Sequence, residues 1–255
     1  MIYGLYLSAS GVMANSYRQD VFANNLANAE TTAFKRDVPL FQQRLVEAQA
    51  NRSKASWSNP LLENLSGGIL ASPTAVDHQQ GEVESTGNPL DVALQGSGMF
   101  QVQDAQGQKH LTRDGQFMVD RTGALILANS TGNRVLDQSG APITIDPAQA
   151  VAISRDGIVS QNSAEVARLG LFDVPDRSKL TKSGNNLLDH PDINQLQPSR
   201  DTTLRTQFVE RANVDAATEL TQLMDAQRSL EANANMIRYQ DQMLGKLVNE
   251  VGKIG

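Results

Sequence analysis

Hydrophobic residues recur at every seventh position along the C-terminal stretch from Val214 to Val251. One line of this repeat contains Leu223, Leu230, Ile237, Leu244 and Val251. A second line, offset by three or four residues, contains Leu220, Gln227, Ala234, Asp241 and Val248. This spacing is the a/d pattern of a coiled coil, and it predicts a helix roughly 55 Å long. A helix with one narrow apolar stripe is expected to pack lengthwise against other long helices, although a helix lying across its own domain is an alternative.

The ends of this helix also carry a signal. Asn213 can cap its start, and Asp215 and Glu219 place negative charge near the positive end of the helix dipole. Good helix formers fill most of the remaining positions, and no proline interrupts them. The sequence therefore predicts one continuous C-terminal helix.

Residues 2–27 predict a second helix with a similar repeat. Its apolar line contains Leu5, Val12 and Leu26, with Gln19 in the remaining place. A companion line of small residues, Ala9, Ser16 and Ala23, would let another helix approach closely. Such a helix is marginal in water without packing. The pattern shows no partner for either terminal helix within the chain, so both are expected to pair only on assembly.

The region between the helices divides into two parts. A helix can continue through Phe41, Leu45 and Ala48, and residues 51–73 read as an irregular linker around the single tryptophan, Trp57. Trp57 fits either an assembly contact or a local cluster with Leu61 and Leu62. From about residue 81, short runs alternate apolar and polar residues, as in the run with Leu90, Val92 and Leu94. These runs predict strands.

Turn signals separate the predicted strands, at 104–107, 114–115, 120–123, 137–140 and 156–157. We expect Gly115 and Gly123, which follow turn residues, to need a positive φ angle. A late strand is expected over 166–172, followed by loops with one short helix up to residue 205. The fold class predicted is α+β: a mainly antiparallel β domain inserted between two long helices that form a coiled-coil-like stem.

Composition narrows the classes of function. The 255 residues carry a net charge of −6, which argues against nucleic acid as a partner. The chain has no cysteine, so disulfide and thiolate chemistry are excluded. No run of about 18 apolar residues predicts a membrane span. The N-terminus lacks the basic start and unbroken apolar centre of a cleaved signal peptide. The protein is expected to stay in the cytoplasm or to leave it by a route that cuts no signal.

The sequence gives only weak signals for catalytic or ligand-binding sites. His78, His110 and His190 are isolated and show no metal-ligand spacing, so they are expected in turns or at the surface. The Gly96-Ser97-Gly98 run has no third glycine and no following helix, so it predicts a bulge or a tight turn rather than a dinucleotide loop. Asp114 and Asp120 lie across a predicted strand and give no acid/base pair. We therefore predict no enzyme activity, no cofactor and no metal.

Three motifs resemble a known family. The run Ala23–Arg36, which contains Asn24, Asn25, Leu26, Asn28 and Phe34, resembles the signature of bacterial flagellar rod and hook axial proteins, roughly A-N-N-L-A-N-x-x-T-x-G-F-K. Ala33 stands where that family usually has glycine. The middle of the chain matches in Asn88–Leu94, Gly96–Phe100 and Leu111–Phe117. The last helix matches in Asn213-Val214-Asp215, in Gln227–Ala234 and in Asp241–Leu244.

The resemblance implies a structural subunit of the flagellar basal-body rod, of distal or proximal type, with a weak preference for the distal type. Its terminal helices would polymerise into a shaft that transmits torque from motor to hook. The implied partners are the chain itself, other rod and hook proteins, the rings around the rod and the flagellar export apparatus. The alternatives are a hook-type axial protein or, from another class, a cell-wall-acting enzyme with a helical stem.

On this reading the chain divides into four segments. Residues 1–36 form the first helix and the signature, 37–80 a linker, 81–205 the β-rich domain and 206–255 the C-terminal helix. The proposed assembly residues are Leu223, Leu230, Ile237, Leu244 and Val251 in the last helix and Leu5, Val12 and Leu26 in the first. The protein would work in the periplasmic part of the flagellum, after export without a cleaved signal peptide and without insertion into a membrane.

Overall fold

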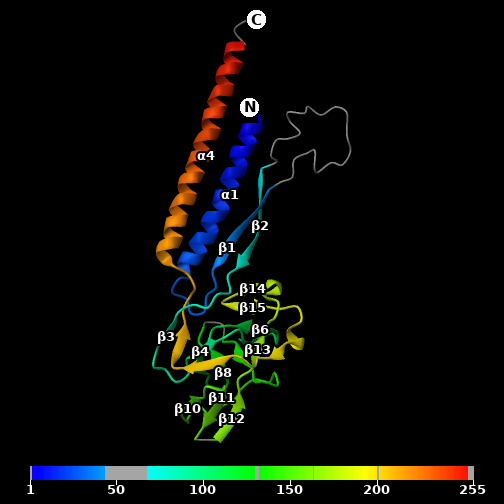
Figure 1. Cartoon of the computed structure of the whole chain (residues 1–255), viewed down its shortest axis with the longest axis vertical. Coiled ribbons are helices and arrows are strands. Elements are labelled where there is room, and N and C mark those ends of the chain that lie inside the picture. The colour runs from blue at the N-terminus through cyan, green and yellow to red at the C-terminus, as the bar shows by residue number, and fades with distance from the viewer. Residues whose placement is uncertain (1, 44–67, 130–131, 163, 200, 252–255) are drawn as a thin grey trace. The chain divides into compact units, whose positions relative to one another are not determined.

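The computed structural model describes residues 2–43, 68–129, 132–162, 164–199 and 201–251. Within these ranges the chain forms two compact units. Unit 1 consists of the described residues of 2–43, 68–77 and 215–251 other than 28–36, and unit 2 of 28–36 and the described residues of 78–214. The α+β class is confirmed, since long N- and C-terminal helices flank a central antiparallel β region (Figure 1).

Unit 1 contains two helices and one strand pair. Helix α1 (Ile2–Ala27) lies side by side with α4 (Ala216–Val251), and the start of α1 and the last turns of α4 lie toward the same end of the pair (Figure 1). Strands β1 (Asp37–Gln43) and β2 (Ile69–Val76) pair antiparallel, with Asp37 opposite Val76 and Gln43 opposite Ile69. The expectation that the terminal helices lack a partner within the chain is therefore wrong.

The start of α4 differs from the prediction in its cap. Asp215, not Asn213, is the capping residue: its Oδ1 accepts from the backbone N–H of Ala217 at 3.1 Å, and its Oδ2 accepts from Thr218 Oγ1 at 2.6 Å. These hydrogen bonds lower the pKa of Asp215. Since the helix begins at residue 216, the segment 206–255 is not helical throughout, and residues 208–210 form a strand.

Strands β1 and β2 replace part of the predicted linker. Phe41 lies in β1, so no helix continues through it, and 69–73 belong to β2. Leu45, Ala48, Trp57, Leu61 and Leu62 lie outside the described residues. Strand β1 packs on α1, where Tyr17 and Phe41 meet edge to face with their ring centroids 6.0 Å apart. Tyr17 Oη also donates to the carbonyl of Ser72 in β2 at 3.0 Å.

Unit 2 is built from short antiparallel strands around two buried hydrophobic clusters, the larger of which contains Phe100 and Phe117. Its strands are β3 (Val83–Ser85), β4 (Val92–Gln95), β5 (Met99–Gln103), β6 (Lys109–Thr112), β7 (Phe117–Val119), β8 (Leu125–Leu127), β9 (Arg134–Val135), β10 (Val151–Ile153), β11 (Ile158–Gln161), β12 (Ala164–Arg168), β13 (Leu171–Asp173), β14 (Thr181–Gly184), β15 (Leu187–Asp189), β16 (Gln197–Pro198), β17 (Thr203–Thr206) and β18 (Phe208–Glu210). Two 3-10 helices, η1 (Arg177–Lys179) and η2 (Ile193–Gln195), follow β13 and β15.

The main sheet follows the order β14-β15-β6-β5-β9-β8-β7, with β13 added beside β5 and β16 beside β13. Strands β10, β11 and β12 form a separate sheet, and β17 pairs with β4 and β18 with β3. The predicted late strand over 166–172 is divided, because β12 pairs with β11 while β13 pairs with β5. Phe100 and Phe117 are buried at the centre, edge to face with centroids 5.1 Å apart.

Gly115 and Gly123 require glycine for different structural reasons. Gly123 has a φ of +82°, as predicted for the turn that begins at Asp120. Gly115 is not among the positive-φ residues; a Cβ built on it would lie 1.8 Å from the carbonyl oxygen of Val92. Gly115 is therefore required by the close approach of two backbones, where its carbonyl accepts from the Val92 N–H at 2.9 Å.

Candidate assembly site

Helices α1 and α4 meet through a heptad register that runs antiparallel. A Cβ built on Gly4 would lie 2.8 Å from Gln240 Nε2, and one built on Gly11 would lie 2.8 Å from Asn233 Nδ2. Further along, Asn25 Nδ2 donates to Glu219 Oε2 at 3.2 Å. Steps of seven and fourteen residues forward on α1 match equal steps backward on α4. The pair is thus a short antiparallel coiled coil with glycines facing long polar side chains.

The predicted apolar line of α4 is partly covered in the single chain. Leu223, Leu230, Ile237 and Leu244 are half-buried, and the side chain of Val251 lies outside the described set. On α1 the predicted residues Leu5, Val12 and Leu26 are half-buried as well. Because the helices were expected to pair only on assembly, Leu230 and Ile237 should be exposed in a single chain; this is wrong, since both are already half-buried.

The companion line of α4 differs from the prediction. Leu220 and Val248 are 47% and 71% exposed, and Gln227 and Asp241 are also exposed. The line that faces α1 instead contains Glu219, Ala226, Asn233 and Gln240. A search for hydrophobic residues alone selects the line with Leu220 and Val248, which points outward. The line that faces α1 contains polar side chains because the glycines of α1 leave room for them.

The companion line of α1 also differs. Ser16 and Ala23 are exposed, so this line of small residues does not form the close contact. The close approach comes from Gly4 and Gly11. The buried residues of α1 near its middle and second half are Ser8, Ala14, Asn15, Val21 and Phe22.

The first half of the family signature forms a buried polar junction in unit 1. Asn25 has 0% exposure, and its side-chain amide donates to the backbone carbonyl of Asp37 at 2.8 Å. Asn25 Oδ1 accepts from the Asp37 N–H at 2.9 Å, and its Nδ2 also reaches the buried carboxylate of Glu219. One asparagine therefore joins α1, β1 and α4. Asn24 is exposed and Leu26 half-buried, so the neighbouring signature positions contribute less to this junction.

The second half of the signature forms a turn in unit 2. The backbone carbonyl of Asn28 accepts from the N–H of Thr31 at 3.0 Å. Ala33 has a φ of +57°, the left-handed conformation that glycine adopts most easily, which explains why the family usually has glycine there. Phe34 is buried, and Lys182 Nζ lies 4.3 Å from the centroid of its ring.

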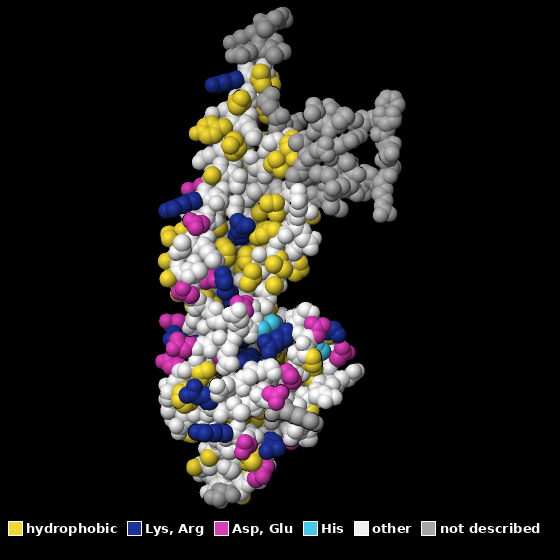
Figure 2. Space-filling view, viewed as in Figure 1, with side chains coloured by type: hydrophobic (Ala, Val, Ile, Leu, Met, Phe, Trp, Pro, Cys, Tyr) yellow, Lys and Arg dark blue, Asp and Glu magenta, His cyan; other side chains and the backbone are white. Residues whose placement is uncertain are grey.

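Apolar side chains also lie on the outward surfaces of the helix pair. On α4 they are Leu220, Met224, Met236, Tyr239, Met243, Leu247 and Val248, and on α1 they are Tyr6, Leu7 and Met13. We call the α4 set the outer face; within it, Leu247 continues the heptad line of Glu219, Ala226, Asn233 and Gln240 beyond the start of α1. Hydrophobic side chains gather along the C-terminal part of α4 in Figure 2. Exposed apolar side chains grouped in this way mark surfaces that another molecule covers.

Unit 2 contains a buried ionic group that the motifs did not predict. Glu210 has a fully buried side chain; Lys35 Nζ donates to its Oε1, and Arg113 Nε donates to its Oε2 at 3.2 Å. Nearby, Asp114 accepts from Thr32 Oγ1 at 3.3 Å and from the Gln116 N–H at 3.1 Å. Burial raises the pKa of Asp114 to about 6, against those hydrogen bonds.

Among the remaining titratable groups, His110 has a local partner. His110 Nδ1 lies 2.5 Å from Asp189 Oδ1, so this histidine is held between β6 and β15. Gly96-Ser97-Gly98 forms the turn between β4 and β5, as predicted, with a φ of +122° at Gly96. Across the described residues, no group of three or more histidine and acidic side chains could hold a metal ion. No helix within the described ranges is long and apolar enough to cross a membrane.

Comparison with known proteins places these features in a family. Three family descriptions match in chain order: "Flagella basal body rod protein" at 5–35, "Flagellar hook protein FlgE/F/G D1 domain" at 93–161 and "Flagellar basal body rod FlgEFG protein C-terminal" at 205–250. These ranges cover the first helix with its signature, part of the β region and the last helix.

Relatives match over nearly their whole length. The flagellar basal-body rod protein FlgF of Caulobacter vibrioides is 35% identical over 98% of this chain and 98% of its own. FlgG of Buchnera aphidicola subsp. Baizongia pistaciae is 33% identical over 97% and 99%, and FlgG of Bacillus subtilis is 31% identical over 98% and 99%. The chain belongs to the family of flagellar basal-body rod proteins.

Proposed function

We propose that this structural rod subunit polymerises through the outward surfaces of its terminal helices, and that the resulting shaft transmits torque from motor to hook. The observation that carries the proposal is the outer face of α4. Pairing with α1 covers part of the helix, yet Met243 stays 59% and Val248 71% exposed. Exposed apolar side chains grouped on one element mark a surface that another molecule covers, and α1 is the helix of the described part that pairs with α4.

The register of the helix pair supports a lengthwise contact. Gly4 lies opposite Gln240, so Ile2, two residues earlier, lies level with Gln242. Helix α4 continues to Val251 and therefore extends past the start of α1. The extension contains Met243, Leu247 and Val248 of the outer face. A helix of a neighbouring subunit would bury these side chains by continuing the stripe that α1 leaves.

The sequence-predicted assembly residues keep a role in this proposal. Leu223, Leu230, Ile237 and Leu244 are half-buried by the chain itself, and a neighbouring subunit would complete their burial. Leu5, Val12 and Leu26 have the same intermediate exposure on α1. Val251 remains a predicted assembly residue from the sequence repeat.

The remaining partners and the location follow from the family. Relatives carry the names of two rod proteins, FlgF and FlgG, and we infer that this chain occupies the basal-body rod beside other rod and hook proteins. It would contact the rings around the rod, and it would leave the cytoplasm through the flagellar export apparatus without a cleaved signal. Its role is mechanical rather than enzymatic.

The test is a single charge on the extension of α4. Met243→Asp should leave the melting curve and helix content of the purified subunit unchanged, because this side chain is exposed in the single chain. In cells that lack the native gene, the variant should be made and exported but should give no motility, since each contact would bury an unpaired charge. Gln242→Asp places the same charge on the neighbouring exposed position and should preserve motility. Motile Met243→Asp cells with intact basal bodies in the electron microscope would refute the proposal.

A further inference from the structure

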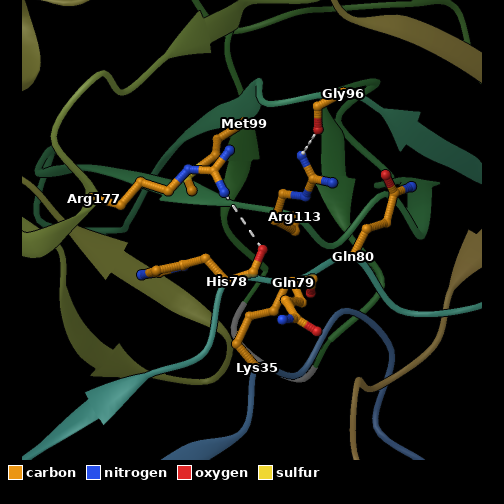
Figure 3. Close-up of a pocket in the computed structure, with 8 residues that line it drawn as sticks. All are labelled: Lys35, His78, Gln79, Gln80, Gly96, Met99, Arg113 and Arg177. Atoms are coloured by element: carbon orange, nitrogen blue, oxygen red, sulfur yellow. Dashed lines mark hydrogen bonds between the residues drawn. The ribbon is translucent and has the colours of Figure 1, made fainter.

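A cavity in unit 2 is bordered by basic side chains. It has a volume of about 190 Å³, and Lys35, His78, Arg113 and Arg177 all line it (Figure 3). None of the residues that line it is acidic. The four side chains come from the signature turn, the segment before β3, the end of β6 and helix η1.

One buried carboxylate near these cations is already engaged. Glu210 lies fully buried and accepts from both Lys35 and Arg113. Arg113 Nη1 also donates to the carbonyls of Gly96 at 2.8 Å and Gly98 at 2.6 Å. The residues that line the cavity therefore include Lys35, Arg113 and Arg177 and no acidic residue.

Arg177 adds its charge without strong hydrogen bonds. Its Nη1 and Nη2 each lie 3.5 Å from a carbonyl oxygen, of His78 and Ser97, which is the outer limit of a hydrogen bond. Figure 3 shows its guanidinium group and that of Arg113 directed toward the same space. Burial lowers the pKa of Arg113, Glu210 opposes this effect, and the charge of Arg177 adds to the lowering. A half-buried arginine on a short surface helix is able to turn its side chain toward water. Arg177 instead faces a second cation, Arg113.

We propose that this cavity binds a small oxyanion between Arg113 and Arg177. Guanidinium groups bind carboxylate and phosphate oxygens, and an oxyanion would replace the repulsion between the two arginines with attraction. Arg177 would supply the paired N–H donors, because most donors of Arg113 go to Glu210, Gly96 and Gly98. The volume suits phosphate or one carboxylate group and lies below the range of sites for larger cofactors. Because η1, the 96–98 turn and the signature turn all border the cavity, the bound anion links three separate segments of unit 2. The site does not depend on rod assembly.

Binding can be measured on the purified full-length chain. Titration calorimetry with inorganic phosphate and with acetate, each at an ionic strength matched with sodium chloride, separates the two oxyanion types. We expect saturable binding of at least one of them and a higher melting temperature than in chloride alone. Arg177→Gln should weaken that binding about tenfold or more, the loss typical of a charge-assisted contact. Arg121→Gln removes the same charge from an exposed turn and should leave the affinity unchanged.

A second readout separates binding from a merely structural role of Arg177. In chloride alone, Arg177→Gln should melt at or above the temperature of the unmodified chain, since one of two facing like charges is gone. A lower melting temperature would overturn the proposal, because Arg177 would then be a structural contact. Absence of saturable binding of either anion, or equal affinity in both variants, would overturn it as well.

Discussion

Asp114→Asn should make unit 2 more stable at neutral pH and remove one part of its pH dependence. In the folded chain burial raises the pKa of Asp114 from 3.8 to about 6. Between these two values the folded state binds more protons than the unfolded state, so the free energy of unfolding falls as the pH rises. A difference of roughly 2 pKa units, at about 1.4 kcal/mol each, makes the ionised carboxylate cost about 3 kcal/mol above pH 6. Asparagine keeps an oxygen that accepts from Thr32 and Gln116.

The assay is urea unfolding followed by circular dichroism at several pH values between 4 and 8. The stability difference between Asp114→Asn and the unmodified chain should be near zero at pH 4 and rise toward about 3 kcal/mol at pH 7.5. Asp137→Asn is a control of opposite sign: burial opposes the effect, but hydrogen bonds from Ser139 and Ala141 hold the pKa of Asp137 below its usual value. That variant should be less stable at neutral pH and converge with the unmodified chain in acid. A stability difference for Asp114→Asn that does not change with pH would refute the reasoning.

Three further predictions concern backbone approach and the helix pair. Gly115→Ala should lower the free energy of unfolding by about 3 kcal/mol, because the new Cβ would overlap the Val92 carbonyl. Gly132 has a φ of +62° but open space around it, so Gly132→Ala should cost about 1 kcal/mol in the same denaturation assay. Leu230→Asp should reduce the helix content of the purified subunit in circular dichroism, since Leu230 is half-buried in the α1–α4 pair, and exposed Gln227→Asp should not; equal spectra would contradict this assignment. Asn25→Leu should cost about 2–3 kcal/mol and speed hydrogen exchange at the Asp37 amide, which loses its acceptor; unchanged exchange there would argue against the polar junction.

The sequence predicted the elements with long, regular patterns. The C-terminal repeat predicted a helix that the structure places at 216–251, and the alternating run with Leu90, Val92 and Leu94 predicted the strand that the structure places at β4. It could not identify the inward companion line of α4. Asn233 and Gln240 face α1 only because Gly11 and Gly4 lie opposite, and this pairing joins residues more than 200 positions apart. Hydrophobicity ranks Leu220 and Val248 above them, although both point outward.

The basic cavity was beyond prediction for the same reason. Lys35, His78, Arg113 and Arg177 share no spacing or motif, and only the sheet topology brings their segments together. The Gly96-Ser97-Gly98 run was correctly predicted as a turn, but its carbonyls also accept from both arginines. By contrast, the family signature predicted an important position at Asn25 directly, because one motif contains the helix end and the turn that follows.

The pairing of glycines on α1 with polar side chains on α4 fixes how far α4 extends past the start of α1. A stripe of leucines alone repeats after seven residues, so two such helices can slide by one heptad at little cost. Here a slide of seven would place Gly4 opposite Asn233 and Gly11 opposite Ala226, and it would separate Asn25 from Glu219. The buried carboxylate would then lose its amide donor, which disfavours the shifted register. The pair therefore has one alignment, and every copy of the chain presents an extension of α4 of the same length.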